Sequence, residues 1–341
     1  MRFVRFCVPT LTWLAFAGAL AYAAAQRLVG EATWPTTVVL YLPHALLVLP
    51  VSGVAMLQAL VGPRRLLLVS LATFGVLLFP IMGLSIGGAR APDHTARVRL
   101  LTYNVDSGRR GVEEILRQIG VAAPDVVLLQ ESTWAVDDAV SAALPGFSFH
   151  RYGQFFIASR YTIQRIARPE KIDVHGVEQF PRYIGYTVDS TLGPLDIWNV
   201  HPISPRDGFA ELRGEGLLRE IEEGGIFAGD TSHLSANTEL RRLQVEDLSA
   251  HARLSKNRVI IAGDTNLPVA SRILADNLGS YQDAFAEVGR GFGYTFPAHR
   301  YVPWMRIDRI LAGPELRFVG VQVGELHGSD HYCVFADIEN R

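Results

Sequence analysis

The amino-acid sequence predicts a mixed α/β domain that follows three membrane-spanning helices. Residues 1–89 of the 341-residue chain carry only five basic side chains and one acidic side chain. From residue 97 onward, short apolar segments that end in polar loops alternate with segments whose apolar residues recur at helical spacing. Many short strands combined with a few helices are typical of a mixed α/β domain.

Three uncharged stretches of the first 89 residues are long enough to cross a bilayer. They cover residues 6–25, 36–61 and 66–89. A helix of about 20 residues spans the hydrocarbon core, and buried helices of soluble proteins rarely run that long without a charge. The sequence therefore predicts a multi-pass membrane region over 1–89 and a short linker over 90–96, with the lipid bilayer as a partner.

Basic residues beside the predicted spans indicate their orientation. Arg2 and Arg5 precede the first span, and Arg64–Arg65 separate the second from the third. Cytoplasmic segments are enriched in Lys and Arg, so three crossings place the following domain outside the cytoplasm. If the first span were instead a cleaved signal peptide ending near Ala21-Tyr22-Ala23, two crossings would lead to the same side. We expect a plasma- or inner-membrane protein with an extracytoplasmic domain.

The charge of the soluble part argues against a surface for extended nucleic acids. Of the 32 basic and 34 acidic residues in the chain, 27 and 33 lie in residues 90–341, which gives that part a net charge of −6. Its only lysines are Lys171 and Lys256. Because nucleic-acid affinity rests on Lys and Arg contacts to phosphates, tight and extended binding is not favoured, although a local arginine groove is possible.

The soluble part reads as many short strands and three clear helices. Strands are predicted over 97–104, 125–130, 155–159, 184–189, 195–200, 258–262, 306–311 and 332–338. Helices are predicted over 111–119, 134–144 and 238–255. The glycine-rich stretch 207–230 has no strong pattern and is expected to be an insertion or a flexible surface loop.

Polar side chains follow or precede the predicted strands at several places. The apolar run 258–262 breaks into Gly263-Asp264-Thr265-Asn266, and Gly328-Ser329-Asp330-His331 leads into another apolar segment. A buried strand fixes position while the loop after it exposes polar groups, as at the rim of an active site. The other candidates of this kind are Asn104, Asp106, Glu131, His201 and Asp308.

These residue types suit metal-assisted hydrolysis of a phosphate ester. Glu131 and Asp106 offer the oxygen ligands that Mg²⁺ prefers. Asp264 can orient or deprotonate the attacking water, and Asn266 can donate to the phosphoryl group. His331, polarised by Asp308, offers a positive donor to the charge that develops on the phosphoryl oxygens.

Each candidate alone has an ordinary structural explanation. Glu131 could be a solvated strand end, Asn104 a turn residue and Asp308 a member of a surface ion pair. His201 before a proline could simply close a loop. Their joint occurrence at strand ends favours a shared site.

The same residues, in order, resemble the motif series of the endonuclease/exonuclease/phosphatase superfamily. This group includes DNase I, abasic-site endonucleases, neutral sphingomyelinases and inositol polyphosphate 5-phosphatases. The resembling motifs are Leu-Leu-Thr-Tyr-Asn104-Val-Asp106, Leu-Leu-Gln-Glu131-Ser, Asn-Val-His201-Pro, Ile-Ala-Gly-Asp264-Thr-Asn266, Arg-Ile-Asp308-Arg-Ile and Gly-Ser-Asp330-His331. The resemblance covers residues 97–338 and implies a catalytic domain over 97–341. It also implies a DNase I-like four-layer sandwich, in which two packed β-sheets are flanked by helices.

The resemblance further implies a Mg²⁺ or Mn²⁺ site and roles for individual residues. Glu131 would be the principal metal ligand, with Asn104 and Asp106 beside it and Asp330 supporting the metal side. Asp264 and Asn266 would handle water and phosphate, Asp308 would pair with His331, and His201 would contact phosphate. Many members have Asn where this chain has Asp106, whereas the abasic-site branch has Asp.

The predicted membrane region favours a lipid as the substrate. Three spans followed by this domain, with Gly293-Tyr294-Thr295-Phe296-Pro297 before Asp308, are similar to bacterial membrane members of the superfamily. Members associated with teicoplanin resistance are among them. We therefore expect a hydrolase of a lipid-linked phosphate or pyrophosphate. An extracellular nuclease or phosphodiesterase is the alternative. A catalytically inactive, membrane-anchored binding module is less favoured, because every group that the hydrolytic mechanism needs is present.

Overall fold

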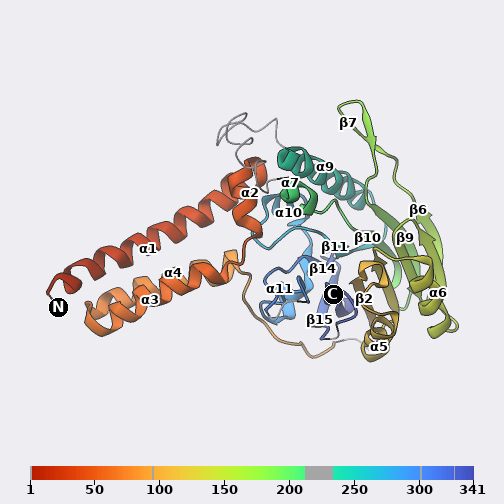
Figure 1. The fold of residues 1–341 in the computed structure, drawn as a ribbon. Coiled ribbons are helices and arrows are strands. Elements are labelled where there is room, and N and C mark those ends of the chain that lie inside the picture. Colours follow the sequence, from red (N-terminus) through yellow and green to blue (C-terminus); the bar gives the residue numbers. More distant parts are fainter. Residues whose placement is uncertain (1, 94–95, 212–232, 300–301, 326) are drawn as a thin grey trace.

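Two six-stranded mixed sheets packed face to face form the centre of the molecule (Figure 1). The computed structural model describes residues 2–93, 96–211, 233–299, 302–325 and 327–341. The first sheet contains, in spatial order, β15 (Leu316–Val323), β16 (Val334–Asn340), β2 (Val98–Asn104), β3 (Val126–Gln130), β5 (Phe155–Ser159) and β4 (Ser148–Tyr152). The second contains β12 (Gln282–Asp283), β14 (Asp308–Ala312), β11 (Arg258–Asp264), β10 (Gly193–Val200), β9 (Tyr183–Ser190) and β6 (Thr162–Ala167).

The main apolar core lies between the two sheets. Leu100 and Leu128 of the first sheet and Ile197 and Ile260 of the second belong to one buried cluster, and none of them is exposed. Alternate residues of a strand face opposite sides of a sheet, so the neighbours of these residues face outward. Full burial of each such side chain contributes about 1.5–3 kcal/mol.

Helices cover the outer faces of both sheets. α5 (Val112–Ala122) and α6 (Trp134–Ala143) pack on the first sheet, and α9 (His233–Arg253) and α10 (Arg272–Leu278) pack on the second. The resulting order is helix, sheet, sheet and helix. The expected two packed β-sheets flanked by helices are therefore confirmed.

Two pairs of parallel strands bring the ends of four strands to one edge of the sandwich. β2 pairs with β3, and β10 pairs with β11. Because parallel neighbours end at the same edge of a sheet, the residues at or just after their carboxyl ends meet there. β14 runs antiparallel to β11, with Asp308 opposite Asp264, so its first residue lies at the same edge.

The N-terminal helices project from the domain (Figure 1). α1 (Arg2–Leu28), α3 (Ala45–Val61) and α4 (Leu67–Val76) pack against one another, and α4 continues into the π-helical turn η3 (Leu77–Ile81). α2 (Trp34–Tyr41) follows the short turn η1 (Gly30–Ala32), which contacts α10 of the domain. Cys7–Leu28 and Arg64–Ile81 are long and apolar enough to cross a membrane, and α2 with α3 make a third candidate if the bent pair counts as one span.

The helices differ from the predicted spans in two places. The expected span 36–61 is bent by 79° between α2 and α3, where Pro43 lacks the N–H donor that a continuous helix needs. The last helix ends at Ile81 instead of residue 89. Ser85–Ile86 (β1) instead pairs with Arg290–Gly291 (β13), which joins this segment to the domain.

Two further expectations are corrected within the domain. The strand expected over 306–311 begins only at Asp308, because the preceding residues pair with the loop around Thr295. Part of the expected loop 207–230 is helical, as α7 (Arg206–Glu211). The rest of that prediction, over 212–230, lies outside the described residues.

Candidate active site

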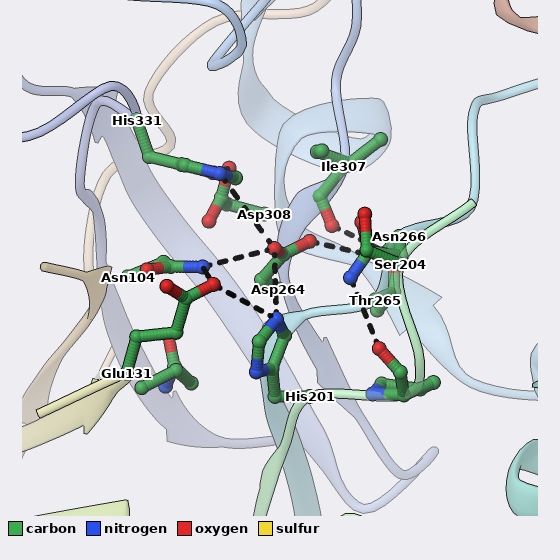
Figure 2. A network of polar contacts seen from close by, with 12 residues as sticks. Asn104, Glu131, His201, Ser204, Asp264, Thr265, Asn266, Ile307, Asp308 and His331 are labelled. Atoms are coloured by element: carbon green, nitrogen blue, oxygen red, sulfur yellow. Dashed lines mark hydrogen bonds and ion pairs between the residues drawn. The ribbon is translucent and has the colours of Figure 1, made fainter. Parts of the chain in front are cut away.

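The carboxylate of Asp264 lies at the centre of the site (Figure 2). Asp264 ends β11 and is 1% exposed. Asn104 Nδ2 donates to its Oδ2 at 3.2 Å, and the Nε2 atoms of His201 and His331 lie 3.5 and 3.7 Å from the same oxygen. Burial raises the pKa of Asp264, while the charge on His331 acts to lower it. A buried carboxylate with a raised pKa is suited to accept a proton.

Gly263 brings the ends of β10 and β11 close together. Its φ is 153°, and a Cβ at this position would stand 2.0 Å from the carbonyl oxygen of Val200. Only glycine avoids that clash. His201 follows Val200 and Asp264 follows Gly263, so this close approach of the backbones sets the separation of the two side chains.

The structure brings Asp308 and His331 together as a buried pair. His331 Nδ1 lies 2.9 Å from Asp308 Oδ2. Burial acts to lower the pKa of His331, but the negative charges of Asp308 and Asp264 outweigh it and raise the pKa to about 10. Near neutral pH both ring nitrogens therefore carry protons, and the Nε2 proton is directed toward the site.

His201 is neutral near neutral pH, in contrast to His331. Burial, together with nearby Arg182 and His331, lowers its pKa to about 4 against the opposing effect of Asp264. Its Nδ1 lies 2.7 Å from Gln154 Oε1. Because an amide oxygen only accepts, Nδ1 carries the proton in this arrangement and Nε2 presents a lone pair. The expected phosphate contact from His201 stays a prediction, and it requires the other tautomer.

Three further predicted carboxylates lie near this centre, but within the described residues their oxygens are not among those that have the spacing of a metal site. They belong to Glu131, Asp106 and Asp330. Burial raises the pKa of Asp106, and the negative charges of Asp330 and Glu131 raise it further, against Arg109. The side chain of Glu131 is 38% exposed and lines the pocket. Carboxylate oxygens are the ligands that a hard divalent cation such as Mg²⁺ or Mn²⁺ prefers, so metal binding by these residues stays a prediction.

Asn104 forms hydrogen bonds with Asp264 and with two of the other predicted site residues, Glu131 and Asp106. Its Nδ2 donates to Glu131 Oε1 at 3.1 Å as well as to Asp264. Its Oδ1 accepts the backbone N–H of Asp106 at 3.1 Å. In this orientation Asn104 positions the carboxylates, and direct ligation of a metal by its oxygen stays a prediction.

A different trio also has the spacing of a metal site. Donor atoms of Asp264, Asp308 and His331 all lie within 4.8 Å of one another. A doubly protonated imidazole has no lone pair for a cation, however, and the pKa of His331 is raised to about 10. In this protonation state the trio is suited to handle protons, and metal binding by Glu131 stays a prediction.

Asn266 has a role that the sequence did not indicate. Its backbone is left-handed, with φ 51°, and its Nδ2 donates to the carbonyl oxygen of Pro202 at 3.0 Å. Its backbone N–H donates to Asp264 Oδ1 at 2.9 Å. Asn266 thus links the loop of Asp264 to the loop of His201. Its expected donation to a phosphoryl group stays a prediction that the second Nδ2 proton could fulfil.

Strained backbone is concentrated in this site. Within the described residues, seven non-glycine positions have positive φ, and Asp106, Glu131 and Asn266 are among them. Such conformations cost on the order of 1 kcal/mol or more and persist where the surrounding structure imposes them.

A pocket of ≈ 340 Å³ opens onto Glu131 and His201. Several of its lining residues were not predicted: Ser107, Ser132, Gln154, Arg182, Ile203, Ser204 and Asp207. Behind it, Gln130 Nε2 donates to Asn199 Oδ1 at 2.8 Å and joins the two sheets. Asn199 lies near the end of β10, two residues before His201, and this spacing was a usable signal that the two side chains face the same side. No local pattern marked Gln154 or Arg182.

The chain belongs to the endonuclease/exonuclease/phosphatase family. The family model matches residues 101–331, which include all nine predicted site residues. A search of curated proteins found no match.

Solved structures similar to this chain share its fold at low sequence identity. A family member from Bacteroides vulgatus aligns with a TM-score of 0.53 and 17% identity, over 72% of this chain and 100% of that chain. A mannosyl-6-phosphatase from Bacteroides thetaiotaomicron aligns with 0.51 and 15%, over 71% and 99%. A 3'-5' exonuclease from Neisseria meningitidis aligns with 0.51 and 18%, also over 71% and 99%.

Proposed function

We propose that this protein is a membrane-anchored, metal-dependent phosphoester hydrolase. Its catalytic domain would lie outside the cytoplasm and act on a lipid-linked phosphate or pyrophosphate. The observation that carries the hydrolytic assignment is the arrangement around Asp264. A buried carboxylate lies between a neutral and a protonated imidazole, beside a pocket that is lined by His201 and by the carboxylate of Glu131.

The chain's own residues divide the reaction between them. Asp264 orients the attacking water and accepts its proton, since its buried carboxylate has a raised pKa. His331, held by Asp308, donates from Nε2 to the phosphoryl oxygen on which negative charge develops. Glu131, Asp106 and Asp330 would hold a divalent cation, which supplies charge neutralisation at the phosphoryl oxygens and the leaving oxygen.

The direction of the helices supports the proposed orientation. α1 and α4 run toward the domain and α3 runs away from it (Figure 1). The chain start and the Arg64–Leu66 turn (η2) therefore lie together at the end far from the domain. Clustered arginines at one end of a helical bundle favour a cytoplasmic location for that end and an extracytoplasmic location for the other.

Anchoring and charge both favour a lipid substrate over nucleic acid. The helices hold the site close to a bilayer, where lipid phosphates are concentrated. Residues 90–341 have a net charge of −6, which disfavours a long polyanion. The fold itself does not decide between substrates, since similar structures include a sugar phosphatase and an exonuclease.

The substrate assignment is tested by comparing two substrates with the same full-length protein in vesicles. We expect kcat/KM for a polyprenyl diphosphate to exceed that for plasmid DNA nicking by about 10²-fold, a difference of roughly 2.7 kcal/mol in transition-state binding. Faster nicking of plasmid DNA would overturn the lipid assignment while leaving the hydrolytic assignment intact.

Arg182 favours a substrate with two phosphoryl groups. It lines the pocket together with His201, and its positive charge acts to lower the pKa of His201. An arginine at the wall of a pocket is suited to a second phosphoryl group, which it can bind through two parallel N–H donors.

We expect Arg182→Gln to raise KM for a polyprenyl diphosphate about 10-fold and to change KM for the monophosphate by less than about twofold, because a charge-assisted contact contributes about 1.5 kcal/mol. Steady-state phosphate release with both substrates measures the difference. Arg168→Gln is a matched control, since Arg168 is not among the pocket residues and its side chain packs over Tyr152. An equal rise in KM for both substrates would exclude a second-phosphate site at Arg182.

A further inference from the structure

The membrane region is connected directly to the loop that carries Asp264. We define this catalytic loop as residues 264–267. Tyr41, the last residue of α2, has its ring buried in the domain, and its hydroxyl donates to the backbone carbonyl oxygen of Asn266 at 2.8 Å. We infer that Tyr41 is a positioning residue for the catalytic loop, so that the membrane region forms part of the active-site scaffold.

Both the ring and the backbone carbonyl of Tyr41 make further contacts with the domain. Its ring meets Phe209 of α7 edge-on, with 5.3 Å between the ring centroids, and the guanidinium of Arg241 lies 5.8 Å above it. Its own carbonyl oxygen accepts Trp304 Nε1–H at 3.2 Å. Trp304 lies four residues before Asp308. The last residue of α2 therefore contacts both the catalytic loop and the segment that leads to Asp308.

A second attachment fixes the start of α2. The carboxylate of Glu31 accepts hydrogen bonds from the Ser271 hydroxyl and from the backbone N–H of Arg272, at the beginning of α10. The Arg272 side chain in turn donates to the carbonyl oxygen of Leu28, the last residue of α1. With both ends bound to the domain, α2 cannot shift without moving the catalytic loop or breaking these contacts.

The hydrogen bond from Tyr41 to Asn266 affects Asp264 through the other hydrogen bonds of Asn266. Its left-handed backbone directs its N–H to Asp264 Oδ1 and its side chain to the carbonyl oxygen of Pro202, next to His201. A conformation of this kind persists where the surroundings impose it. The Tyr41 hydroxyl is one such restraint, and it acts two residues from Asp264.

This inference rests on the proposed function, and its test is Tyr41→Phe in the full chain in vesicles. The ring is kept, so packing against Phe209 is retained and only the hydroxyl is lost. We expect kcat to fall about 10-fold with KM nearly unchanged, because small displacements of catalytic groups cost up to about 10²-fold. Tyr22→Phe is the matched control, since the Tyr22 hydroxyl contacts His44 within the membrane region.

Coupling to Asn266 distinguishes positioning from a general structural role. Asn266→Gly keeps the carbonyl oxygen and the left-handed backbone but removes the side-chain contact with Pro202, which is a second restraint on the same loop. Because both changes loosen one loop, kcat of the double variant should differ by more than about threefold from the product of the two single effects, since contacts in one network are not additive. Independent, multiplying effects of the two changes, or equal effects of Tyr41→Phe and Tyr22→Phe, would overturn the inference.

Amide hydrogen exchange tests the same inference without a substrate. Exchange in a peptide covering residues 264–267 should be about 5-fold faster in Tyr41→Phe than in Tyr22→Phe, because one buried hydrogen bond is lost. Unchanged exchange in Tyr41→Phe would contradict the inference, whether or not the protein hydrolyses a phosphoester. If the wild type were inactive but the exchange changed as expected, only the proposed function would be contradicted. If Tyr41→Phe does not fold, Trp304→Phe removes the neighbouring Nε1 donor and should produce the same faster exchange.

Discussion

Replacing Asp264 by Asn is expected to lower kcat by about 10³-fold, within the range that a positioned proton acceptor contributes. Asparagine has nearly the same shape and can still accept a hydrogen bond, but it cannot take a proton from water. The carboxylate is 1% exposed and its pKa is raised by burial, so a neutral amide is tolerated at this position. We therefore expect the melting temperature to change by only a few degrees. Phosphate release with a generic phosphodiester, measured beside a thermal melt, checks both expectations.

Asp196→Asn is the matched control for this change. Asp196 lies on the adjacent strand β10, where its Oδ1 accepts the Thr187 hydroxyl at 2.7 Å, and it is not among the residues that line the pocket. Its replacement should leave kcat within about twofold, because the half-buried Asp196 hydrogen-bonds Thr187 and Asn257 and, within the described residues, contacts no residue of the site. If Asp264→Asn and Asp196→Asn had the same kcat, Asp264 would not be the proton acceptor.

Removing divalent cations is expected to abolish turnover, and adding Mg²⁺ or Mn²⁺ is expected to restore it. The carboxylate of Glu131 lines the pocket, and without a cation it would repel a phosphate ester. Glu131→Gln should raise the Mg²⁺ concentration for half-maximal activity by at least about 10- to 100-fold, because even changes to residues that only support metal ligands have effects of that size. Titration of chelated enzyme with Mg²⁺ measures this constant.

Glu113→Gln on α5 is the control, since Glu113 is exposed in the first turn of that helix. It should leave the Mg²⁺ requirement unchanged. Full activity after exhaustive chelation would contradict a metal-assisted mechanism, and an unchanged Mg²⁺ requirement in Glu131→Gln would contradict the assignment of Glu131.

The buried strands were predictable because their apolar runs end sharply at polar residues. β5 has the predicted bounds, and β2 and β3 differ from the predicted strands by one residue at their first position. The strands β4 and β6 were not predicted because most of their residues are half-buried or exposed, as is usual at the edge of a sheet. β15 was not predicted either, and its register shift between Phe318 and Gly320 interrupts the alternation of a regular strand.

The site was predictable to the extent that its residues stand at strand ends. Asn104, Asp264 and Asp308 meet because parallel and antiparallel pairing brings their strand ends to one edge. The contacts of Gln154 with His201 and of Tyr41 with Asn266 join positions 47 and 225 residues apart. Such pairs leave no periodic pattern in the sequence, since they depend on how the completed layers pack.

The bend in the second predicted span was not predictable for the same reason, because it accompanies contacts between residues that are distant in the sequence. Length and composition indicate a span, but they do not distinguish a continuous helix from α2 and α3 separated by a bend. The contacts of Glu31 and Tyr41 with the domain accompany that bend. The segment predicted as the second span therefore also contacts the catalytic loop.

The central claim, hydrolysis of a phosphoester by the groups around Asp264 with a divalent cation, is tested most directly by one measurement. Phosphate release by the full-length protein in vesicles is followed with a polyprenyl diphosphate, with Mg²⁺ or with chelator, for wild type and Asp264→Asn. We predict release only by wild type with Mg²⁺, at a rate about 10³-fold above the other three conditions. Equal rates in all four conditions would contradict it.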